Sequence, residues 1–140
     1  SPGLTLFAGV HGRELFSGAN RVLFGPDNVT PDDFSHEQSL VLETEEGLVI
    51  FNSCSHAGAD NIINEVAAAF PGKTVRAMIG GFHLYNKSEA EVKTLAQKLE
   101  ATGVAYICTG HCTGPKAYEL LARTLGRRLH PLQVGLTMEF

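Results

Sequence analysis

Residues 36–63 read HEQSLVLETEEGLVIFNSCSHAGADNII, and this stretch determines the fold class. Two apolar runs, Ser39 to Glu43 and Leu48 to Phe51, are separated by a short polar linker, a pattern that predicts a β-hairpin. Directly afterwards, Ala59 to Phe70 places apolar residues at helical spacing and is followed by a Pro-Gly pair that stops the helix. A strand that runs into an amphipathic helix indicates an α/β chain.

The alternation of strand and helix continues beyond this stretch. We expect strands at Val75 to Ile79 and Val104 to Cys108, and helices at Ser88 to Thr102 and Gly114 to Leu125. The connections strand–helix–strand require parallel neighbours. The prediction is therefore a layered α/β half-domain with a mixed sheet and three helices. Two short strands, Leu129 to Val134 and Leu136 to Phe140, are expected to complete it.

Composition limits the class of protein. The 140 residues are 44% hydrophobic and 19% charged, which suits one globular domain, here treated as a single partial domain over 1–140. Residues 1–35 are rich in Gly, Pro, Asn and Asp, so we expect a loop-rich segment with short strands at Leu4 to Phe7 and Val22 to Phe24. The net charge of -4 and the scattered basic residues disfavour nucleic acid as a partner.

The expected location is the cytoplasm. No apolar run approaches the roughly 20 residues that span a bilayer, so a membrane is not an expected partner. Three cysteines cannot all pair within the chain, which favours a reducing compartment.

Three histidines occupy equivalent places relative to the predicted strands. His56, His83 and His111 lie five, four and three residues after the ends of successive strands, in the loops SCSHAG, GGFHL and TGHCTG. Parallel strands of one sheet end on the same side, so three imidazoles should meet at one rim. One histidine alone is more often structural than a ligand, but three in equivalent places favour a metal. Zinc accepts three histidines and keeps a fourth position open, so we predict a metal site here.

The cysteines are assigned by their surroundings. Cys54 is expected to join the metal site because thiolates bind zinc strongly. Cys112 is expected to point away from its neighbour His111, and Cys108, inside a strand, is expected to be a small core residue.

Other polar residues are candidates for substrate contacts. His36 is predicted either as a substrate-binding residue or as a polar group at the start of the hairpin. Lys116 and Arg13 could contact a phosphate or another anionic group, because SHAGADN and CTGPK also present backbone N–H groups where helices begin. A serine nucleophile is disfavoured because the GxSxG spacing is absent.

The stretches HEQSLVLETEEGLVIFNSCSHAGADNII, AMIGGFHL and TGHCTG, in this order and spacing, resemble the metallo-β-lactamase superfamily. The closest resemblance is to its branch of 7,8-dihydropterin-6-yl-methyl-4-(β-D-ribofuranosyl)aminobenzene 5′-phosphate synthases. It implies the C-terminal half of an αββα sandwich, with His56, His83 and His111 at a metal site between the sheets. It also implies that Cys54 lies near a bridging aspartate position of other members, and that the complete domain holds up to two ions, zinc or else manganese or iron.

The family's HxHxDH motif occurs nowhere in this sequence. The resemblance implies that the complete domain is a metal-dependent hydrolase of a phosphate-bearing or pterin-like small molecule, whereas the absence of this motif leads us to expect that this chain alone is inactive. Two rival functions are a truncated, non-catalytic half-domain and a small-molecule or phosphate-binding module.

The missing half also bears on assembly. A chain without one sheet should expose the inner face of the other, to which Val41, Val49, Phe51 and Ile79 are expected to contribute. Large exposed apolar patches are rare on monomers, so we expect a homodimer or a separate N-terminal half as partner.

Overall fold

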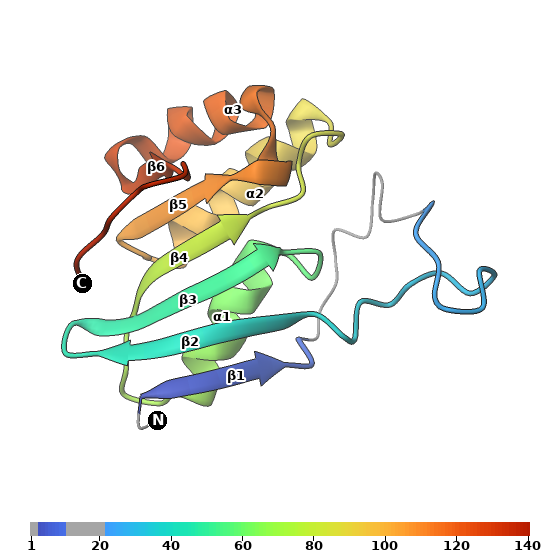
Figure 1. The fold of residues 1–140 in the computed structure, drawn as a ribbon. Coiled ribbons are helices and arrows are strands. Elements are labelled where there is room, and N and C mark those ends of the chain that lie inside the picture. Colours follow the sequence, from blue (N-terminus) through green and yellow to red (C-terminus); the bar gives the residue numbers. More distant parts are fainter. Residues whose placement is uncertain (1–2, 11–21) are drawn as a thin grey trace.

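The centre of the molecule is one six-stranded mixed sheet in the order β1-β2-β3-β4-β5-β6 (Figure 1). The structure is a computed structural model, and it describes residues 3–10 and 22–140. The strands are β1 (Leu4–Ala8), β2 (Gln38–Thr44), β3 (Gly47–Cys54), β4 (Val75–Gly81), β5 (Tyr106–Gly110) and β6 (Leu129–Pro131). The helices are α1 (Ala59–Ala69), α2 (Glu89–Ala101) and α3 (Pro115–Leu125), with short 3₁₀ turns η2 (His111–Thr113) and η3 (Gly126–Arg128).

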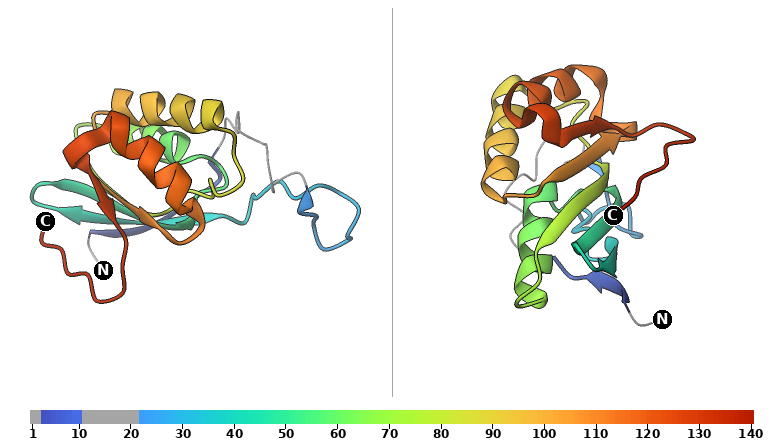
Figure 2. Two further views of the ribbon diagram at one scale, coloured as in Figure 1. Left: turned by 90° about the horizontal axis from the view of Figure 1, so that it is seen from above. Right: turned by 90° about the vertical axis from the view of Figure 1, so that its left-hand side faces the viewer.

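The predicted hairpin and crossovers are confirmed. β1, β2 and β3 are antiparallel neighbours, whereas β3, β4, β5 and β6 run parallel. The parallel strands are joined through α1, α2 and α3, and all three helices cover one face of the sheet (Figure 2). Helix α2 begins with a complete capping box between Ser88 and Glu91. No described helix has the length and apolar character needed to cross a membrane.

Of the two short strands predicted at the C-terminal end, the first is confirmed over Leu129–Pro131 only, and the second was wrong. β6 ends at Pro131, and residues 136–140 form no strand. Instead, the C-terminal segment crosses the sheet face opposite the helices (Figure 2). Near the other end, residues 22–24 contribute only an isolated bridge between Phe24 and Pro31.

The main core lies between the sheet and the helices. Val41, Ile50, Met78 and Ile107 are cross-strand neighbours in successive strands, and all are fully buried in this core. The expectation that Val41 lies on an uncovered face was therefore wrong, because its strand position points it toward the helices.

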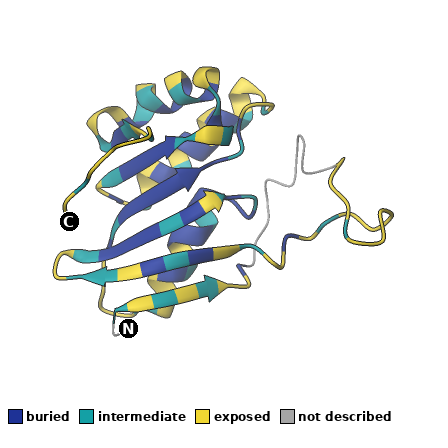
Figure 3. Cartoon of the chain, in the orientation of Figure 1, coloured by how far each residue is buried: buried dark blue, intermediate teal, exposed yellow. Residues whose placement is uncertain are grey.

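Among the described residues, other segments cover the opposite face of the sheet at one end only. Val49 and Ile79 are buried there, and Phe51 is partly buried, because the C-terminal residues Leu132, Met138 and Phe140 pack on the same cluster. At the β1 edge the apolar face is open: Leu6, cross-strand neighbour of Leu40, is 70% exposed, and Leu4 is 47% exposed (Figure 3). The uncovered surface thus lies on β1 and β2.

Candidate metal centre

The candidate site lies at the edge of the sheet where β3, β4 and β5 end (Figure 1). Cys54 pairs with Gly81, and Gly81 pairs with Gly110, so the three strands finish side by side. The loops that follow carry His56, His83 and His111. The predicted convergence of the three histidines on one rim is confirmed.

The atoms that could hold a metal ion form two groups that share one thiol. Cys54, His56 and His83 make one group, and Cys54, His111 and Cys112 make the other. Within each group the ligand atoms lie within 4.8 Å of one another. The three histidines therefore do not form a single three-imidazole set, and Cys54 is the residue that links them.

The two ring nitrogens of His83, one of the candidate metal ligands, make no hydrogen bond. Both Nδ1 and Nε2 are buried, and neither has a hydrogen-bond partner. Its ring centroid is 4.3 Å from that of His56. Buried polar atoms in folded proteins almost always have a partner, so a ligand-free imidazole here is costly. A cation is one group that would satisfy such nitrogens.

Electrostatics keep this pair of imidazoles neutral. Burial lowers the pKa of His56 from 6.5 to about 4, and the nearby His83 adds to the shift. Burial also lowers the pKa of His83, with contributions from Lys87 and His111. Neutral imidazole is the form that binds metal ions. Both side chains are therefore ready to coordinate at neutral pH.

Cys112 joins the site contrary to expectation. Its Sγ accepts a hydrogen bond from the backbone N–H of His83 and lies over β4, where Gly81 leaves room for it. A Cβ atom added to Gly81 would come within 2.7 Å of this Sγ. Burial, followed by a hydrogen bond with Cys54, raises the pKa of the Cys112 thiol. Cys108 is fully buried in the core, as expected.

Several residues at the site have a strained, left-handed backbone conformation. Four described residues other than glycine have positive φ, and three of them are Phe34, His83 and His111, at 53°, 50° and 50°. Aromatic and imidazole side chains adopt this region at a cost of about 1–3 kcal/mol each. Such strain persists where surrounding structure enforces it, and it is commonest at functional sites.

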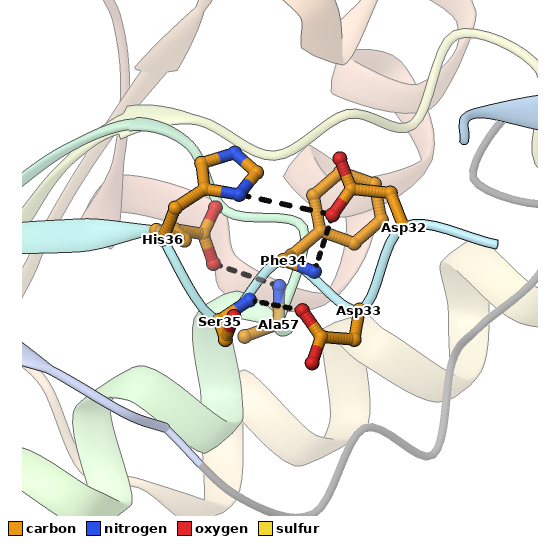
Figure 4. A network of polar contacts seen from close by, with 7 residues as sticks. Asp32, Asp33, Phe34, Ser35, His36 and Ala57 are labelled. Carbon is orange, nitrogen blue, oxygen red and sulfur yellow. Dashed lines mark hydrogen bonds and ion pairs between the residues drawn. The ribbon is translucent and has the colours of Figure 1, made fainter. Parts of the chain in front are cut away.

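The segment before β2 contributes residues other than the one predicted. The His36 side chain is 72% exposed and lies 3.7 Å from Asp32, in a loop that also passes Ala57 (Figure 4). Its neighbours Phe34 and Glu37 contact the site instead: Phe34 stacks on His56, and Glu37 binds the backbone of the same turn. A substrate contact by His36 stays a prediction.

Lys116 and Arg13 are the remaining predicted substrate-binding residues. Lys116 is exposed, and its Nζ lies 3.1 Å from Glu89 on α2. Burial of that ion pair is slight, so Lys116 could still exchange partners. Arg13 lies outside the described residues. Their roles in substrate binding stay predictions.

Comparison with known proteins gives two likenesses. No family model matches the chain. The 7,8-dihydropterin-6-methyl-4-(β-D-ribofuranosyl)-aminobenzene-5′-phosphate synthase of Methanocaldococcus jannaschii is 33% identical over 112 residues, which make up 80% of this chain and 38% of that protein. A solved metal-dependent hydrolase of the β-lactamase superfamily matches 100% of this chain and 54% of its own, with a TM-score of 0.83 and 27% identity.

The chain thus spans 38% of the curated relative and about half of the solved one. The likeness in structure extends over the whole chain, and the sequence likeness over most of it. By sequence and by fold, the chain is similar to members of the metallo-β-lactamase superfamily.

Proposed function

We propose that this chain supplies a zinc site to a metal-dependent hydrolase domain that acts on a phosphate-bearing or pterin-like small molecule. The observation that carries the proposal is that Cys54 belongs to two groups of donor atoms, beside a half-buried His83 whose buried ring nitrogens have no hydrogen-bond partner. The solved relative is a metal-dependent hydrolase, which supports the reaction class. The curated relative is named as the synthase of a compound that contains a dihydropterin and a phosphate group, which supports the substrate class.

The residues present fit a zinc-like ion. The two groups offer two thiols and three imidazoles, and neither contains a carboxylate. Thiolates prefer zinc and other soft ions, and imidazole suits zinc and iron, whereas manganese prefers oxygen ligands. Zinc is therefore the favoured ion, iron comes second, and manganese third. A complete domain could hold two ions.

The roles of the side chains follow from their positions. Cys54 with His56 and His83, or with His111 and Cys112, would hold the ion. A bound zinc ion supplies Lewis acidity toward a phosphate or carbonyl oxygen. A cavity of about 370 Å³ borders His111 and is also lined by Tyr118, Leu132 and Gln133. This volume is within the range of small-molecule sites, so we place the substrate there.

The lining indicates which part of a substrate the cavity would take. It includes Glu119 and an aromatic ring, and no lysine or arginine among the described residues. A phosphate would meet no cationic side chain of the lining. We therefore propose that the cavity receives an uncharged ring, with the phosphate directed outward.

A phosphate-binding module is less well supported. The backbone N–H groups of His56 and Ala57, in the turn before α1, already donate to the carboxylate of Glu37. A phosphate would have to displace this side chain. The non-catalytic half-domain keeps one supporting observation, the absence of HxHxDH from the sequence.

Metal titration and activity assays separate these functions. We expect zinc to bind one ion per chain in calorimetry, and cobalt to give a thiolate charge-transfer band. Phosphoesterase activity should be absent from the chain alone and should appear when a segment carrying HxHxDH is added. Failure of both metals to bind would favour the non-catalytic half-domain. Activity of the chain alone would mean that the ligands are misassigned.

A further inference from the structure

A carboxylate from outside the site fixes the turn that carries His56. Glu37 Oε1 accepts a hydrogen bond from the backbone N–H of His56 at 2.7 Å, and Oε2 accepts one from Ala57 at 2.9 Å. Hydrogen bonds to a charged acceptor are about twice as strong as neutral ones. The following helix α1 has Gly58 at its N-cap and no side-chain cap of its own. Glu37 therefore supplies two side-chain contacts that hold this turn, and the Nδ2 of Asn61 adds a third by donating to the carbonyl of Ala57 at 2.9 Å.

An aromatic ring from the same segment holds the imidazole. Phe34 is buried, and its ring centroid lies 4.3 Å from that of His56 with only 7° between the ring planes. The His83 ring lies at the same centroid distance from His56. The imidazole thus contacts a hydrocarbon ring and a fellow candidate ligand.

Hydrogen bonds within the segment fix the backbone between Asp32 and Glu37. The backbone N–H of Glu37 donates to the carbonyl of Phe34, and the Phe34 N–H donates to Asp32. These bonds hold Phe34 at its strained φ of 53°. This backbone conformation of Phe34 places its ring against the imidazole of His56, which is consistent with backbone strain at a functional site.

We infer that Phe34 and Glu37 form a clamp of positioning residues that fixes His56, and through its turn Cys54, in the geometry a metal ion requires. This inference rests on the proposed zinc site. Neither residue belongs to a donor group. Residues that orient metal ligands typically change metal affinity by about 10–100-fold when they are replaced.

The test compares four variants in two states of the protein. In metal-free protein, Glu37→Ala should speed hydrogen exchange at the His56 and Ala57 amides by more than about tenfold, and Phe34→Leu should remove the ring-current shift of the His56 ring protons. With metal, Glu37→Ala should weaken zinc binding by about 10–100-fold and alter the cobalt spectrum. Glu37→Gln, which keeps one acceptor oxygen, should fall between Glu37→Ala and wild type.

Asp27→Asn is the matched control. Asp27 also accepts hydrogen bonds from backbone N–H groups in this part of the chain, at Val29 and Thr30, but it contacts no donor of the site. Its replacement should leave zinc affinity and the cobalt spectrum unchanged. Unchanged amide exchange in Glu37→Ala, or equal loss of affinity in Asp27→Asn, would overturn the clamp.

The clamp and the proposed function fail in different ways. If the wild type binds no zinc, the proposed function is wrong, and the exchange and ring-current data still decide whether Phe34 and Glu37 hold the turn. If zinc binds equally well to wild type and to both folded Glu37 variants, the function stands and the positioning role is wrong. Circular dichroism establishes that each variant is folded.

Discussion

The backbone N–H of His83 donates a hydrogen bond of 3.2 Å to Sγ of Cys112. Each residue belongs to a different donor group, and the two groups meet at Cys54. The loop after β4 is therefore tied directly to the turn after β5. Loss of one thiol should not affect the two groups equally, because only Cys54 serves both.

The cysteine variants test this arrangement. Cys54→Ser should abolish tight zinc binding, since it removes a donor from both groups. Cys112→Ser should weaken binding by at least about tenfold but leave the Cys54, His56 and His83 group intact. Zinc calorimetry and the cobalt charge-transfer band are the measurements. Cys108→Ala, which removes a core thiol away from the donors, should leave both signals unchanged.

The stability of the metal-free protein should depend on pH through His56. Its pKa falls from 6.5 to about 4 on folding, chiefly because of burial, so between these values the unfolded chain binds more protons than the folded one. Stability should be full above about pH 6.5 and decrease as the pH falls toward 4. Solvent screens part of the effect, and we expect a loss of roughly 1–2 kcal/mol.

Urea unfolding across this pH range measures the effect. His56→Gln should flatten the dependence, because it removes the titrating ring. His36→Gln, at an exposed position, should change the curve only slightly, because His36 is a minor contributor to the lowered pKa of His56. A wild-type stability that does not change between about pH 7 and 4.5 would show that the His56 ring is not held in a desolvated environment.

Sequence patterns predicted the elements that have one dominant local signal. The apolar run Leu48 to Phe51 and the helical spacing of Ala59 to Phe70 each fix one element, and strand ends then place the histidines on one rim. The C-terminal strand was wrong for a physical reason. Leu136, Met138 and Phe140 alternate as in a strand, but alternation reports only that one side is covered. Met138 and Phe140 pack on the sheet face without joining the ladder.

The supporting residues of the site left no local signal. Glu37 acts on backbone groups 19 and 20 positions ahead, so neither spacing nor propensity reveals it. His36 was predicted from its place just before the hairpin, its side chain is 72% exposed, and a substrate contact by it stays a prediction. Cys112 was misjudged because its place depends on the close approach that Gly81 allows, which only the folded structure displays.

Gly81→Ala should damage the site through a steric conflict. The added methyl group would lie 2.7 Å from Cys112 Sγ and 2.7 Å from the backbone oxygen of Ser53, and the backbone cannot yield easily. We expect about 1–3 kcal/mol of destabilisation and weaker zinc binding, measured by urea unfolding and calorimetry. Gly25→Ala, where the nearest atoms are at 3.7 and 3.8 Å, should change stability by less than about 0.5 kcal/mol. Equal effects of both substitutions would contradict the close approach of Cys112.

The last prediction concerns the open part of the sheet. Leu6 is 70% exposed and Leu4 47% on the face that the C-terminal residues leave uncovered, and Leu42, the cross-strand neighbour of Leu4, is 36% exposed. Contiguous apolar surface of this kind usually meets a partner. We therefore expect a homodimer or larger assembly in which a second copy covers this face. A separate N-terminal half is the other partner that would cover it.

Light scattering decides between these outcomes. Leu6→Asp should shift the wild-type assembly toward monomer while circular dichroism stays unchanged, because a carboxylate at the contact would lose its hydration. Val29→Asp, at a 76% exposed loop position, is the matched control and should leave the mass unchanged. A wild-type monomer that stays monomeric as its concentration rises would contradict self-association. Binding of a separately expressed N-terminal half to that monomer, and not to Leu6→Asp, would then assign the same face to such a half.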